Sequence, residues 1–163
     1  MNHPDRVTEM QSLGDGEQLI LWAFRMVAVG RSGCPGLRRA FVETCGAGGE
    51  EAFISLFTFA RYIGHRARRP IRLRTPGCQE TTADEQSLLA LFAAARDGFG
   101  GGRDDRLRAH FSWLVEGPPS EAVILMVKVV AQALHDAGAP LREPAPAFAP
   151  PPRVARPELR TIH

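Results

Sequence analysis

The stretch LILWAFRMVAV, residues 19–29, decides the fold class of this chain. Every side chain in it except Arg25 is apolar, so a helix formed here has no fully solvated face. Asp15 with Gln18 forms a variant of the reciprocal capping pattern before the stretch, and Gly30 follows it, which predicts a helix from about Asp15 to Gly30. We expect this helix to be the central one of the domain, or half of an interface.

Further helices are predicted from apolar side chains spaced three and four positions apart and from residues that favour helix ends. They cover residues 35–45, 49–65, 82–98, the segment between Asp104 and Gly117, and 120–137. Thr82 with Glu85 is the clearest helix start, because it matches the Ser/Thr-x-x-Glu capping pattern. The sequence therefore predicts an all-α fold, a compact bundle of five or six helices.

The intervening segment 66–81 is divided by Pro70 and Pro76 and lacks helical spacing. Its alternating residues 71–74 fit a short strand, but without an evident partner strand we predict an extended loop.

The domain organisation follows from length and composition. A chain of 163 residues that is 44% apolar can bury one hydrophobic core, so we expect one helical domain over residues 15–138. Residues 1–14 are predicted to be a disordered arm. Residues 139–163 are rich in Pro, Ala and Arg, bury too little apolar surface to offset the entropy of ordering, and are predicted to be a disordered tail.

Charge and cysteine content limit the class of protein. The net charge of +2 is too small to mark the whole molecule as a nucleic-acid binder. The N-terminal residues lack the apolar stretch of a secretion signal, and no apolar run is long enough to span a bilayer. Three cysteines without dense spacing fit reduced thiols. We expect a cytoplasmic protein that is not bound to a membrane and carries no cofactor.

The strongest local charge signal is a run of arginines. Within 14 residues that contain no Asp or Glu, the chain carries Arg61, Arg66, Arg68, Arg69, Arg72 and Arg74, with Tyr62 and His65 among them. Such a segment can bind the phosphates of a nucleic acid or nucleotide, and Tyr62 can stack on a base. The alternative is a solvated loop whose arginines pair with Glu80, Asp84, Glu85 or other acidic groups.

The cysteines offer a second, independent hypothesis. Cys34 and Cys78 each precede a predicted helix, where the helix dipole can lower the pKa of a thiol. They are candidates for a redox or regulatory site, and His65 completes a zinc site only if Cys45 also turns inward. No Cys-x-x-Cys pair is present, and the default interpretation is ordinary, partly buried thiols.

The remaining patterns indicate no catalytic site. The loop Gly98–Gly102 lacks the Gly-Lys-Ser/Thr ending of a phosphate-binding loop, and Asp104 with Asp105 is explained by helix capping. His110 and His135 match no metal-ligand spacing, and we expect both at the surface or at the boundary of the core.

We therefore predict a non-enzymatic cytoplasmic interaction or regulatory module, in which the apolar first or last helix contributes to a homodimer or to a protein-partner surface. The alternatives are phosphate or nucleic-acid binding by the arginine run and a thiol-based redox or metal sensor at Cys34 and Cys78.

Overall fold

A computed structural model describes residues 8–96 and 104–142. Its α-helices are α1 (Asp15–Ala28), α2 (Pro35–Cys45), α3 (Gly49–Arg66), α4 (Ala83–Arg96), α5 (Asp104–Leu114) and α6 (Glu121–Asp136). Short 3-10 helices cover Met10–Ser12 and Gly46–Gly48. These two described segments contain no strand, only isolated bridges, so the all-α prediction is confirmed. The predicted Gly98–Gly102 loop and the predicted tail beyond residue 142 lie outside them.

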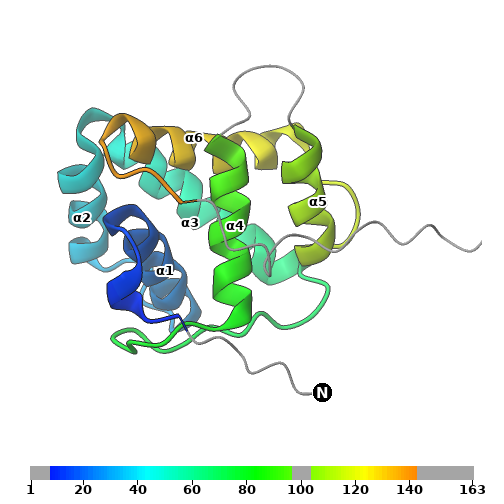
Figure 1. The fold of residues 1–163 in the computed structure, drawn as a ribbon, viewed down its shortest axis with the longest axis horizontal. Helices are drawn as coiled ribbons and strands as arrows, with labels where there is room; N and C mark the ends of the chain where they lie inside the picture. Colours follow the sequence, from blue (N-terminus) through cyan, green and yellow to red (C-terminus); the bar gives the residue numbers. More distant parts are fainter. Residues whose placement is uncertain (1–7, 97–103, 143–163) are drawn as a thin grey trace, which may run out of the picture.

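The helices form a bundle in which α4 stands near the middle (Figure 1). The α3 and α6 helices pack against each other, and α6 also packs against α4. In Figure 1, α1 and α2 lie on one side of α4, and α5 lies on the other. No helix in the described part of the chain has the length and apolarity needed to cross a membrane.

Four phenylalanines from four helices meet at the centre of the core. Phe59 of α3 packs edge-on against Phe24 of α1, Phe92 of α4 and Phe111 of α5, with ring centroids 6.2, 5.6 and 5.9 Å away. Edge-to-face packing at these distances is the favoured geometry for aromatic pairs. This cluster fixes α1, α3, α4 and α5 around one point.

Most of the apolar stretch in α1 is buried inside the domain, although Ala28 at its end is exposed. Ile20 and Leu21 have no exposed surface, and Arg25, its one polar residue, is only 2% exposed. The helix α1 begins at Asp15, as predicted, but the predicted capping residue is wrong by one position, because the N-cap is Gly14 and not Asp15. The amide of Gly14 donates to Oε2 of Glu17 at 2.7 Å, so the carboxylate that satisfies the helix start is that of Glu17.

The other predicted helix starts can be compared directly. Thr82 Oγ1 accepts from the amide of Glu85 at 3.1 Å, and Oε2 of Glu85 accepts from the amide of Thr82 at 2.9 Å, so this capping box is confirmed. Ser120 caps α6 by accepting from the amide of Val123 at 3.4 Å.

The packed domain extends beyond residues 15–138 at both ends. The amide of Met10 donates to the carbonyl of Gln79 at 2.7 Å, which holds the N-terminal segment against the loop before α4. At the other end, Leu141 is only 2% exposed, and Arg142 forms an ion pair with Glu17 at 2.9 Å. One apolar anchor and one ion pair thus keep residues 139–142 on the domain.

Candidate ligand-binding pocket

The segment that joins α3 to α4, residues 67–82, carries most of the predicted arginine site and runs along the lower edge of the molecule in Figure 1. Carboxylates at the start of α4 hold it in place. Asp84 accepts two hydrogen bonds from the guanidinium of Arg69, at 2.6 and 2.9 Å, and one from the amide of Arg72 at 2.7 Å. Glu85 accepts from the amide of Arg74 at 3.0 Å.

Glu85 also binds α1 through a buried ion pair. Nε and Nη2 of Arg25 donate to its two carboxylate oxygens at 2.7 and 3.1 Å. The same guanidinium donates to the carbonyls of Cys78 and Glu80, at 2.7 and 2.8 Å. Arg25 and Glu85 therefore connect α1, α4 and the 67–82 segment in one network.

The ionisation of Asp84 follows from its surroundings. Burial alone would raise the pKa of this carboxyl, but the hydrogen bonds from Arg69 and from the Arg72 amide outweigh it and hold the pKa of Asp84 below its ordinary value. The same contact raises the pKa of Arg69. The pair is therefore charged at neutral pH, and it anchors the loop.

The side chains of four of the six predicted arginines make hydrogen bonds within the described part of the chain. Arg69 pairs with Asp84 and lies over the ring of Trp113 at 5.3 Å, and Arg74 pairs with Glu80 at 2.9 Å. Arg68 donates to the carbonyl of Ser112 at 2.8 Å, and Arg66 donates to that of Glu116 at 3.4 Å. The ion pairs of Arg69 with Asp84 and of Arg74 with Glu80 are among the pairs that the sequence suggested as the alternative to a phosphate site.

Arg61 and Arg72 differ from these four. Arg61 lies 6.0 Å from the centre of the Phe57 ring, and the side chain of Arg72 is exposed.

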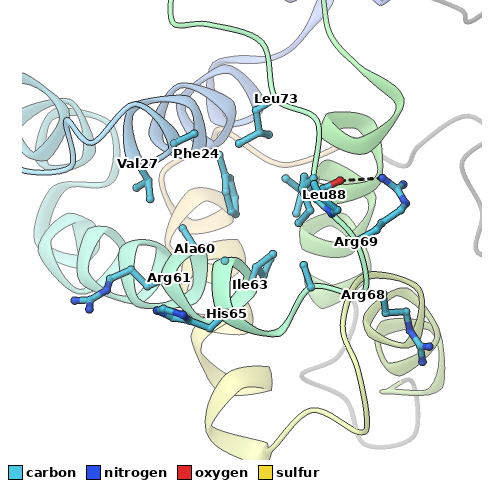
Figure 2. A pocket seen from close by; sticks show the side chains of 15 residues that line it. Phe24, Val27, Ala60, Arg61, Ile63, His65, Arg68, Arg69, Leu73 and Leu88 are labelled. Carbon is cyan, nitrogen blue, oxygen red and sulfur yellow. Dashed lines mark hydrogen bonds between the residues drawn. The ribbon is translucent and has the colours of Figure 1, made fainter.

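A pocket of about 690 Å³ lies between α1, α3, α4 and the first half of this segment. Its apolar walls come from four parts of the chain, and in Figure 2 their side chains converge on one space. The apolar lining consists of Phe24, Val27 and Ala28 of α1, Ala60 and Ile63 of α3, Ala67, Pro70, Ile71 and Leu73 of the loop, and Leu88 of α4.

The polar lining of the pocket is entirely basic. It comprises Arg61, His65, Arg68 and Arg69, together with the bare backbone of Gly64, and includes no acidic side chain. Figure 2 shows Arg61 and Arg68 directed outward on opposite sides, whereas Arg69 turns toward the Pro70 carbonyl, to which it donates at 3.2 Å. We call this cavity the Arg-rimmed pocket, because its walls are apolar and Arg61, Arg68 and Arg69 contribute to its lining.

The structure does not bring the predicted thiol and metal residues together. Cys34 is the N-cap residue of α2, Cys78 lines a different pocket beside Trp22, and His65 lines the Arg-rimmed pocket. Over residues 8–96 and 104–142, no three His, Cys, Asp or Glu side chains are grouped as a metal site requires. All three cysteines are free and half-buried, and burial raises the pKa of the Cys45 thiol.

His110 is placed differently from the prediction. It is only 5% exposed, whereas His135 is exposed as expected. Burial, reinforced by the nearby charge of Arg106, lowers the pKa of His110. Its position on the inner face of α5 beside Phe111 explains the error, since a single histidine has no periodicity of its own.

Three of the six predicted arginines line the pocket, whereas Arg66, Arg72 and Arg74 do not, and sequence reasoning missed the apolar walls. These walls belong to segments as distant as Phe24 and Leu88, and no sequence pattern connects them. One signal pointed to the network beside it: Arg25 is the only polar residue in the apolar stretch, and such a residue needs a buried acidic partner.

Comparisons of this chain with protein-family models, with curated proteins and with solved structures gave no match. The case for function therefore depends on the geometry of the pocket.

Proposed function

We propose that this protein is a non-enzymatic cytoplasmic binding module whose Arg-rimmed pocket takes a small organic anion with an apolar body. The observation that carries this proposal is the composition of the lining, which has basic side chains, apolar side chains and no acidic one. The volume of about 690 Å³ falls within the range of small-molecule sites.

The two parts of the ligand correspond to two parts of the pocket. An apolar body replaces water against Phe24, Ile63 and Leu73, which releases the free energy of apolar burial. The charges of Arg61 and Arg68 attract an anionic group of the ligand, although the two side chains point outward on opposite sides of the pocket (Figure 2). Neither arginine forms an ion pair within the described segments.

The internal contacts of the arginines favour this ligand over a nucleic acid. Contacts to several successive phosphates need several available cations, and the charges of Arg69 and Arg74 are already shared with Asp84 and Glu80. A ligand with one anionic group needs only the arginines at the rim.

A pair of matched probes tests the proposal. Calorimetric titration with dodecanoate and with dodecylammonium, both below their micelle concentrations, keeps the apolar body constant and reverses the charge. We expect dodecanoate to bind to the protein and dodecylammonium to bind at least about tenfold more weakly. Equal affinity for both, or no binding of dodecanoate, would overturn the proposal.

Variants locate the binding. Arg61→Gln with Arg68→Gln removes the two arginine charges of the lining that form no ion pair within the described segments, and it should weaken dodecanoate binding about tenfold. The control is Arg39→Gln, which removes one exposed charge of α2 that does not line the pocket. If the control loses as much affinity as the double variant, the anion is not bound at this opening.

A second candidate function is a protein-partner or homodimer surface on α6. Leu125 is 57% exposed, and Ala122, Met126 and Val129 continue the same apolar face at helical spacing. Because α1 is buried, α6 is the helix that retains this part of the sequence prediction. Sedimentation equilibrium over a concentration series tests it: a dimer that Leu125→Glu dissociates supports the surface, and a monomer throughout contradicts self-association.

A further inference from the structure

Gly64 in α3 occupies a position that packing within the domain does not explain. Its φ is not positive, so its backbone conformation is one that any residue adopts in a helix. A Cβ built on Gly64 meets nothing within 4 Å. Since glycine stabilises a helix less than alanine does, the chain gives up some stability here without a steric reason of its own.

At two other helical glycines, Gly49 and Gly16, close packing does explain why the residue is glycine. A Cβ on Gly49 would overlap the backbone of Phe41 and Val42, and one on Gly16 would lie 2.5 Å from the carbonyl oxygen of Ala139. Those glycines permit close contact between segments of the chain. No such neighbour stands beside Gly64.

Gly64 is exposed, and the open space beside it includes the edge of the Arg-rimmed pocket. Gly64 lines that pocket from α3, next to Ile63 and between the two basic residues Arg61 and His65. A glycine on a pocket wall lets a bound molecule approach the helix backbone more closely than any side chain would allow.

We infer that Gly64 is the specificity-determining residue of this pocket, because the apolar body of the bound anion lies directly against the α3 backbone there. The inference rests on the proposed function. On this inference, a Cβ at position 64 takes up part of the space that the ligand body fills, so a methyl group weakens ligand binding while it improves the helix.

The test measures stability and binding in the same variants. Gly64→Ala should raise the melting temperature by about 2–4 °C, because it adds helix propensity without a clash. It should also weaken dodecanoate binding about tenfold, because the new methyl group overpacks the occupied site. The matched control is Gly36→Ala in α2, where a Cβ meets only Sγ of Cys34 at an ordinary 3.7 Å and does not line the pocket. The control should raise the melting temperature and leave binding unchanged.

The outcomes separate this inference from the proposed function. If the wild-type protein binds no dodecanoate, the proposed function fails. If the wild type binds and Gly64→Ala binds equally well, the role of Gly64 is refuted while the pocket stands. A drop in the melting temperature of Gly64→Ala would also refute it, since the glycine would then serve packing.

Discussion

Arg25 and Glu85 lie 60 positions apart in the sequence and form a two-pronged ion pair with side-chain exposures of 2% and 0%. An ion pair this deeply buried is strongly destabilising to break, because the remaining charge has no solvent around it. Here each partner has further bonds that compensate for lost hydration. Arg25 donates to two carbonyls, and Glu85 accepts from two amides.

Glu85→Gln should lower the free energy of unfolding by about 3–5 kcal/mol, because it leaves the guanidinium of Arg25 buried without a counter-charge. Urea denaturation measures the change. Glu43→Gln is the control, since Glu43 pairs with Arg39 at the surface and its loss should cost less than about 1 kcal/mol. Similar losses in the two variants would contradict the assignment of a buried network.

Asp84 should make stability depend on pH in acid. Its pKa is lower in the folded state than in the unfolded chain, so the folded state binds fewer protons. The stabilisation is present above the ordinary value of 3.8 and is lost as the pH falls through the lower folded value. We expect Asp84→Asn to be less stable than the wild type at pH 7 and to converge with it in strong acid. A constant difference between pH 7 and pH 2 would show that the charge of Asp84 contributes nothing.

His110 should make stability depend on pH in a higher range, close to neutral pH. Its pKa is lowered from 6.5 on folding, so the two states bind equal numbers of protons well above that value. As the pH falls below 6.5, the unfolded chain takes up the proton first and stability declines. Chemical denaturation between pH 8 and pH 5 should show this decline, and His110→Leu should remove it. An unchanged profile in the variant would assign the decline to other groups.

Gly49→Ala should be destabilising by about 1–3 kcal/mol, although alanine is the better helix former, because its methyl group would overlap the backbone of Phe41 and Val42. Thermal unfolding beside Gly36→Ala gives the comparison, since the latter should be stabilising. If both substitutions stabilise the protein, α2 and α3 are not in close contact at Gly49.

The sequence was sufficient to predict helices whose signals are local. Thr82 and Glu85 are three positions apart and cap α4 as their spacing predicts. Ser120, the first residue of the predicted helix 120–137, is the N-cap of α6. The helix α1 starts at Asp15 as predicted, but its capping pair was assigned wrongly, because Glu17 and Gln18 are adjacent residues that can both serve in a capping pattern. Only the path of the backbone distinguishes them.

The site was less predictable, because it depends on contacts between distant segments. The sequence suggested, as one alternative, that the arginines of the run pair with nearby acidic residues, and Arg69 and Arg74 do so. It did not show that Arg69 closes one side of a cavity whose opposite wall includes Val27. The route of residues 67–73 determines that cavity, and the route is set by Asp84 and Glu85 rather than by any pattern in the loop itself.

The way that loop is fastened has a consequence for local opening. The amides of Arg72 and Arg74 donate to carboxylates at the start of α4, one of which is shared with the ion pair to α1. A segment without regular secondary structure normally exchanges its amide hydrogens by small fluctuations. These two amides are tied to a helix start and to the protein core, so they should exchange with deuterium as slowly as amides inside α4. We therefore expect the wall of the pocket that this loop forms to open only when the start of α4 also unfolds.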